Sequence, residues 1–130
     1  LLKQTATRAE ILRLCEEARQ WNFFSVCVNP FWVESCATFL RGSDVKVCSV
    51  VGFPLGANLA ECKREEAERV LARGAEEIDV VINVGALKSG DIYVVQQELR
   101  HLTEVCRDRA ALKVIVESGQ LTHEELLRAI

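Results

Sequence analysis

Two hydrophobic periods alternate along the chain. Short apolar runs rich in Val and Ile predict strands at residues 25–29, 45–51, 78–84 and 112–118. Between and around them, apolar residues recur every three or four positions, which predicts helices at residues 8–20, 30–41, 59–73, 92–107 and 123–130. Because strand and helix alternate strictly, the sequence predicts right-handed β-α-β units and a parallel sheet.

The predicted helix starts carry capping signals. Thr7, Asn58 and Thr122 each precede a Glu by three residues, which is the spacing of a capping box. Pro30 and Asp91 mark two further starts. We predict that residues 52–58 and 83–90 are connecting turns; the first leads to a helix N-terminus, where it could also contribute to a substrate site at the rim of the sheet.

The two faces of the predicted strands differ in polarity. Ile78 and Val80 point to the opposite face from Asp79, and Leu112 and Val114 to the opposite face from Lys113. A doubly wound sheet, such as a flavodoxin-like sheet binding a phosphorylated ligand, would bury both faces under helices and so disfavours these charges. Barrel strands instead turn one face to the helices and the other to the lumen.

The predicted fold is therefore α/β: a partial TIM (β/α) barrel with about four parallel strands alternating with helices. A complete barrel has eight strands in about 250 residues. Residues 1–130 are expected to form a single partial barrel domain of about half that size.

Asp79 and Lys113 are the main candidates for chemistry. They hold the second position of two neighbouring strands, so we expect them side by side in an enclosed, water-poor lumen. A buried charge needs a partner, so a static ion pair is one interpretation. Proton transfer in catalysis is the other, and Asn83 and Glu117 lie further along the same strands, toward the C-terminal rim.

Composition narrows the function classes. The chain has 49% hydrophobic and 27% charged residues and a net charge of −3, without a basic patch, which argues against a nucleic-acid partner. No apolar stretch approaches the roughly 20 residues of a membrane span. The start of the chain lacks a secretory pattern, so we expect a truncated, cytoplasmic protein.

Cysteine, histidine and tryptophan often occur in functional sites, but here we expect them to be buried core residues or solvent-exposed helix residues. Six cysteines have no metal-ligand spacing, so we expect no metal site and interpret them as reduced, buried thiols. We expect the two histidines to be solvated on helices and the two tryptophans to be packing anchors; these residues are His101, His123, Trp21 and Trp32.

Four consecutive motifs resemble bacterial deoxyribose-phosphate aldolase. They are Ser-Val-Cys-Val-Asn-Pro at 25–30, Lys-Val-Cys-Ser-Val-Val-Gly-Phe-Pro-Leu-Gly at 46–56, Glu-Ile-Asp-Val-Val-Ile-Asn-Val-Gly-Ala-Leu at 77–87 and Leu-Lys-Val-Ile-Val-Glu-Ser-Gly at 112–119. The resemblance implies a TIM barrel that reversibly condenses acetaldehyde with glyceraldehyde 3-phosphate through a lysine Schiff base, without a cofactor. This chain would supply roughly the second to fifth β/α units.

The resemblance also implies roles for individual residues. Asp79 matches the family's proton-relay aspartate and Lys113 its lysine partner, whereas Cys27 lines the pocket. Leu2 matches a hydrophobic residue that contacts the substrate. Asn29, two residues after Cys27, is also expected to bind the substrate. The expected partners are a small phosphorylated sugar or aldehyde and further copies of the chain.

The family's Schiff-base lysine, in a Lys-Thr-Ser-Thr-Gly motif on the sixth strand, has no counterpart in these residues, and neither do its phosphate-binding loops. We therefore expect little aldolase activity from the 130 residues alone. Two functions stay open: an aldolase portion that needs the rest of the barrel, and a non-catalytic half barrel that self-associates through its exposed strand edges.

Overall fold

The computed structural model describes residues 1–130, which form one parallel sheet with the strand order β1-β2-β3-β4. The strands are β1 (Ser25–Val28), β2 (Lys46–Val51), β3 (Glu77–Val81) and β4 (Ala111–Ile115). Every neighbouring pair is parallel and consecutive in sequence. This sequential order confirms β-α-β units that curl in one direction, and it excludes the doubly wound alternative, whose strand order reverses.

The longer helices agree with the prediction. They are α1 (Arg8–Gln20), α2 (Val33–Phe39), α3 (Ala60–Ala72), α5 (Ile92–Cys106) and α6 (His123–Ala129), with short 3₁₀ turns at η1 (Pro30–Trp32) and η2 (Ser118–Gln120). None has the length and apolar character needed to cross a lipid bilayer.

Several local expectations were wrong. The predicted turn at residues 83–90 contains a short helix, α4 (Val84–Lys88), because the Asn83 side chain accepts a hydrogen bond from the Ala86 N–H at 3.0 Å. The predicted capping boxes form at Thr7 and Thr122, but α3 starts after Leu59, and no side chain caps it. Strands β3 and β4 end about three residues early.

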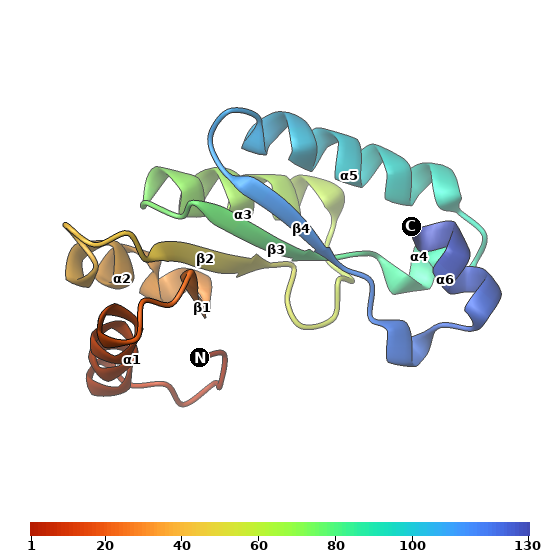
Figure 1. Cartoon of the computed structure of the whole chain (residues 1–130). Coiled ribbons are helices and arrows are strands. Elements are labelled where there is room, and N and C mark those ends of the chain that lie inside the picture. Colours follow the sequence, from red (N-terminus) through yellow and green to blue (C-terminus); the bar gives the residue numbers. More distant parts are fainter.

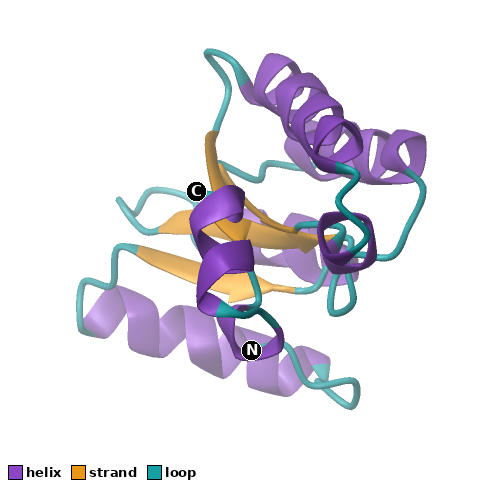
Figure 2. Cartoon of the chain, turned by 90° about the vertical axis from the view of Figure 1, so that its right-hand side faces the viewer, coloured by secondary structure: helices purple, strands orange, loops and turns teal.

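The core lies between one face of the sheet and the helices. Val26, Val47 and Ile78 from three strands pack with Ile11 of α1 and Val70 of α3 in a single cluster. Figures 1 and 2 show the helices on the outer side of the curved sheet, with α3 and α5 side by side, while the opposite, inner face carries no helix along the strands. This is the layering of a barrel wall, with helices on the outside and an uncovered face on the inside.

The predicted cysteine and tryptophan environments hold only in part. Cys15, Cys36, Cys48 and Cys106 are buried and Cys27 is half-buried, but Cys62 is exposed because it lies on the outer side of α3. Trp32 packs against the core, whereas Trp21, at the C-terminal end of α1, is 67% exposed and anchors nothing. Both histidines are solvent-exposed, as expected.

Candidate active site

Asp79 and Lys113 lie together on the inner face of the sheet. They are register partners on β3 and β4, and Lys113 Nζ is 2.8 Å from Asp79 Oδ1. Neither side chain is covered by a helix, as the alternation of the strands predicts. The expectation of an enclosed lumen is wrong for these residues, because the Lys113 side chain is 49% exposed and the Asp79 side chain 21%.

A second carboxylate, which the sequence analysis missed, belongs to this site. Glu77 lies two residues before Asp79 on the same face, its side chain is 5% exposed, and its Oε2 is 3.4 Å from Lys113 Nζ. Burial opposes the charge of Lys113, but contact with Asp79 and the negative charges of Glu77 and its other neighbours outweigh it and raise the pKa of the ammonium. Lys113 is therefore held protonated.

Two cysteine sulfurs complete the cluster around Asp79. Cys27 Sγ lies 3.8 Å from Asp79 Oδ2, and Lys113 Nζ lies 3.7 Å from Cys48 Sγ. The two sulfurs and a carboxylate oxygen of Asp79 fall within 4.8 Å of one another, a donor set that could hold a thiophilic metal ion. The Lys113 ammonium already supplies a positive charge to that carboxylate, which favours an ion pair over a metal at this position.

Of the predicted substrate-binding residues, Cys27 contacts Asp79, whereas Asn29 and Leu2 lie beside the cluster at the end of β1. Asn29 follows β1 and its Nδ2 donates a hydrogen bond to the Leu2 carbonyl at 3.2 Å. This bond places the N-terminal segment beside the C-terminal end of β1. Asn83 caps α4, and Glu117 follows β4 in a left-handed conformation with φ of 53°.

A buried ion pair supports the sheet from behind. Lys63 of α3 is fully buried, and its Nζ donates hydrogen bonds to Glu98 Oε1 of α5 at 2.7 Å and to the Val81 carbonyl at 2.8 Å. It thereby connects both helices to the C-terminal end of β3. The sequence analysis did not single out Lys63 or Glu98.

The loop after β2 is fitted around the Lys63 side chain. Gly52 has φ of 62°, and a Cβ on it would lie 2.8 Å from Lys63 Cε. Its N–H donates to Glu66 Oε2 at 2.8 Å. The first turns of α3 thus fix the loop between β2 and α3 at the rim of the inner face.

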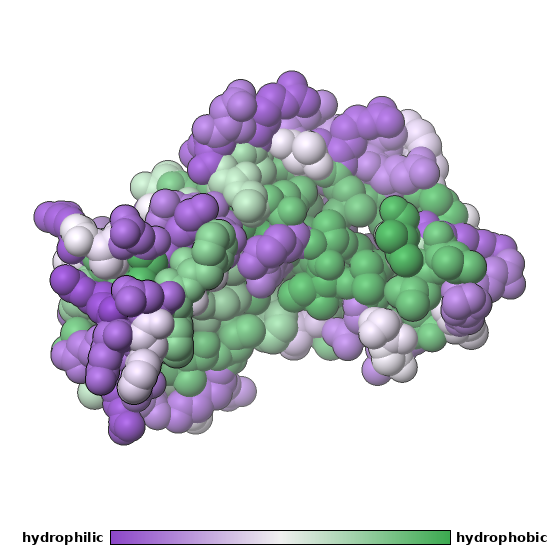
Figure 3. Space-filling view, in the orientation of Figure 1, coloured by the Kyte–Doolittle hydropathy of each residue, from purple (hydrophilic) through white to green (hydrophobic).

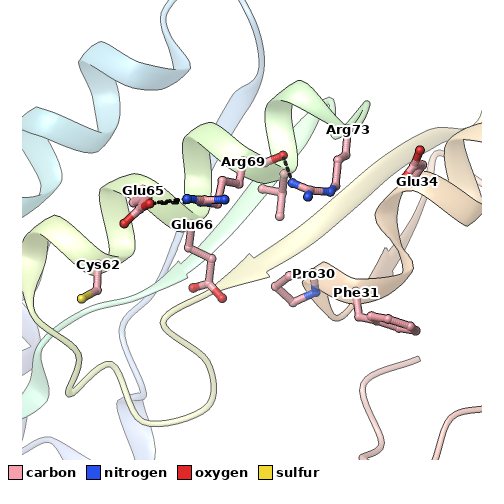
Figure 4. A pocket seen from close by; sticks show the side chains of 9 residues that line it. Pro30, Phe31, Glu34, Cys62, Glu65, Glu66, Arg69 and Arg73 are labelled. Atoms are coloured by element: carbon pink, nitrogen blue, oxygen red, sulfur yellow. Dashed lines mark hydrogen bonds and ion pairs between the residues drawn. The ribbon is translucent and has the colours of Figure 1, made fainter.

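The largest surface cleft lies elsewhere. A volume of about 620 Å³ opens between η1 and α3, on the helical side of the sheet (Figure 4). Its charges are largely satisfied within α3: Glu65 pairs with Arg69, and Arg73 donates to the Arg69 carbonyl. None of the candidate site residues lines this cleft, so it is separate from the cluster around Asp79.

The fold is that of part of a (β/α) barrel, with an ion pair between adjacent strands on its inner face. The model of the DeoC/LacD aldolase family matches residues 2–126, and the chain belongs to this family. A deoxyribose-phosphate aldolase of Geobacillus sp. (strain WCH70) is 53% identical over 129 residues, which are 99% of this chain and 58% of that protein.

Solved structures agree with the fold. A tetrameric deoxyribose phosphate aldolase from Aeropyrum pernix superimposes with a TM-score of 0.90 at 31% identity, over 99% of this chain and 54% of that one. The aldolase QR15 superimposes with a TM-score of 0.91 at 36% identity, over 97% and 56% of the two chains. The chain thus spans a little over half the length of its relatives.

Proposed function

We propose that residues 1–130 form the part of a deoxyribose-phosphate aldolase that carries the proton-transfer groups. The single observation that supports this most is the ion pair of Asp79 and Lys113, which lies on the inner face of a barrel wall rather than beneath a helix. In this proposal the 130 residues are roughly the second to fifth β/α units. The remainder of the barrel supplies the imine-forming lysine and the phosphate site.

The proposed reaction is the reversible cleavage of 2-deoxyribose 5-phosphate to acetaldehyde and glyceraldehyde 3-phosphate. The C2–C3 bond breaks when the C3 hydroxyl loses its proton and the bonding electrons pass into an imine at C1. Asp79 is suited to accept that proton, directly or through one water. Lys113, held protonated beside Asp79, is suited to return a proton and to stabilise negative charge.

Cys27, Asn29 and Leu2 are proposed to line the substrate side of this pair. Cys27 touches Asp79, and Asn29 holds the Leu2 backbone at the same end of the sheet. In this arrangement the apolar Leu2 side chain would contact the carbon chain of the aldehyde, whereas Asn29 would act by positioning that segment. These roles need no metal ion or organic cofactor.

A chimera tests the function directly. Joining residues 1–130 to the part of the Geobacillus relative that they do not cover would complete eight strands. We expect this chimera to cleave 2-deoxyribose 5-phosphate, and Asp79→Asn and Lys113→Met to lower kcat by about 10²–10⁴-fold. Lys88→Met, a change on α4 away from the pair, is the matched control.

A chimera that has a native circular dichroism spectrum and melts cooperatively, yet retains full activity in Asp79→Asn and Lys113→Met, would leave the pair with a static structural role.

Self-association is the second proposal, and a distinct observation supports it. Strands β1 and β4 are the two edges of the sheet, and Figure 3 shows an apolar band across the middle of the open face. An unpaired edge and an uncovered apolar face both favour contact with a further chain. We propose that copies of this chain associate through them; the relative from Aeropyrum pernix is tetrameric.

A further inference from the structure

The inner face contains a pair of thiols in a position to react with each other. Cys27 on β1 and Cys48 on β2 are direct register partners, so their side chains leave the same face of adjacent strands. Adjacent strands lie about 4.8 Å apart, and that spacing falls within the Cα separation of about 4.4–6.8 Å that disulfides span. The two sulfurs are within 4.8 Å of each other.

The surroundings of the pair favour reaction with an oxidant. Cys27 is half-buried on the open face, so a small molecule can reach it, whereas Cys48 is fully buried behind it. Hydrogen bonding with the Cys48 thiol lowers the pKa of Cys27 and outweighs burial and the Asp79 carboxylate, which both raise it. The Lys113 ammonium, 3.7 Å from Cys48 Sγ, favours negative charge on the pair.

We propose that Cys27 and Cys48 form a reversible disulfide when the protein meets a peroxide, and that this bond acts as a redox switch on the Asp79 cluster. Cys27 is the attacking thiol and Cys48 the resolving thiol. Of the six cysteines, these two alone join two strands next to the acid–base pair.

The chemistry balances with hydrogen peroxide as the oxidant. The Cys27 thiolate attacks one peroxide oxygen, the O–O bond breaks, and hydroxide leaves to become water, which gives a sulfenic acid. The Cys48 sulfur then attacks the Cys27 sulfur, the S–O bond breaks, and a second water leaves. Two thiols and one peroxide thus give one disulfide and two waters, and a dithiol such as dithiothreitol reverses the change.

The disulfide would alter the site without a change of fold. Bonding to Cys48 removes the Cys27 thiol as a donor to Asp79 Oδ2, from which its sulfur now lies 3.8 Å, and it removes the Cys48 thiol that lies 3.7 Å from Lys113 Nζ. Asp79 and Lys113 would keep their contact but lose both thiol neighbours. The thiol chemistry does not depend on aldolase activity, so this proposal and the proposed function can fail separately.

Peptide mapping of the 130-residue chain tests the proposal. After treatment with equimolar to modest excess hydrogen peroxide, we expect the intact mass to fall by two hydrogens, measured before the remaining free thiols are blocked for mapping. The peptides containing Cys27 and Cys48 should be cross-linked, and dithiothreitol should restore both thiols. Cys48→Ser should abolish the cross-link and leave Cys27 as a sulfenic acid that a dimedone probe traps.

Two further cysteine sites provide the controls. Cys62→Ser removes the exposed thiol and should leave the cross-link unchanged. Cys15 and Cys36 are also neighbours, but both are buried in the core between α1 and α2, so they should stay reduced at the same dose. A cross-link between Cys15 and Cys36, or oxidation confined to Cys62 while Cys27 and Cys48 stay free, would overturn the proposal.

Discussion

Lys63 of α3 and Glu98 of α5 form an ion pair that is closed to solvent, with 0% and 2% of their side chains exposed. The Lys63 ammonium also donates to the Val81 carbonyl at the end of β3. Two helices and a strand are thus joined at one nitrogen atom, directly behind the rim where the candidate site opens.

Removing one partner of this pair should destabilise the fold strongly. Lys63→Met leaves the Glu98 carboxylate buried without its partner, which typically costs about 3–5 kcal/mol. Lys63→Met combined with Glu98→Leu should recover much of that loss because no charge is then left unpaired. Urea unfolding of the single and double variants measures both values. Equal losses in the two variants would mean that the pair is not the source of the effect.

The contrast between this pair and Asp79–Lys113 shows what the sequence can reveal. Strand alternation places Asp79 and Lys113 on the same side at the same height, so their contact could be predicted from position alone. Lys63 and Glu98 lie on two helices, and the hydrophobic periodicity does not show how those helices cross. A signal existed, since Lys63 stands at the first position of the buried stripe that continues with Ala67 and Val70.

The predicted half barrel implies an open inner face, but the exposure of its individual side chains could not be foreseen, for a related reason. The alternation predicts which side chains point inward, but the exposure of Lys113 depends on how many strands face it across the lumen. Glu77 was missed although it shares the parity of Asp79. The hydrophobic pattern predicts a strand that starts at residue 78, whereas β3 begins at Glu77.

Gly56 should tolerate no side chain. Its φ is 66°, and a Cβ would lie 1.9 Å from the Ile82 carbonyl oxygen. Gly90, with φ of 83° and open space around it, is the matched control. Gly90→Ala should cost roughly 1–2 kcal/mol from the left-handed backbone. Gly56→Ala should lower the free energy of unfolding by the same backbone contribution and by roughly 1–3 kcal/mol more, because the new Cβ overpacks against Ile82. Thermal or urea unfolding compares them, and equal losses would contradict this role for Gly56.

The capping box of α1 should give the stability a defined pH dependence. A hydrogen bond from Lys3 and bonds from Thr7 lower the pKa of Glu10 from 4.5 to about 2. The unfolded chain therefore takes up a proton at higher pH than the folded chain, so the stabilisation is complete above pH 4.5. It is lost as the pH falls toward 2.

Glu10→Gln isolates this contribution. The difference in unfolding free energy between native protein and variant should be constant above pH 5 and should shrink between pH 4.5 and 2. Glu16→Gln, on the same helix but without capping contacts, should show no such narrowing. If the difference in unfolding free energy between the native protein and Glu10→Gln does not depend on pH, ionisation of the Glu10 carboxylate does not stabilise the helix start.

The edge of β4 should control self-association. The Ala111 N–H donates to the Glu76 carbonyl just before β3, and the Ile115 carbonyl accepts from the Ile82 N–H just after β3. Residues 111 and 115 therefore bond to the β3 side, and because bonding alternates along a strand, the Val114 N–H points outward from the sheet edge. Val114→Pro would block pairing at this edge without removing a bond to β3. Sedimentation velocity should show an assembly for the native chain and a shift to smaller species for the variant. A native chain that is a monomer at micromolar concentration would contradict the proposal that the chain associates through the β4 edge.

Lys113 should not act as the imine-forming amine, because a protonated amine is not a nucleophile. Reduction with borohydride after incubation with acetaldehyde or 2-deoxyribose 5-phosphate should leave Lys113 unmodified in peptide maps of the native chain. Asp79→Asn removes the contact that raises the pKa of Lys113, so the neutral fraction and any adduct at Lys113 should increase. Asp91→Asn, before α5, is the control and should change nothing. An adduct at Lys113 in the native chain would reverse the assignment and make this lysine the candidate nucleophile.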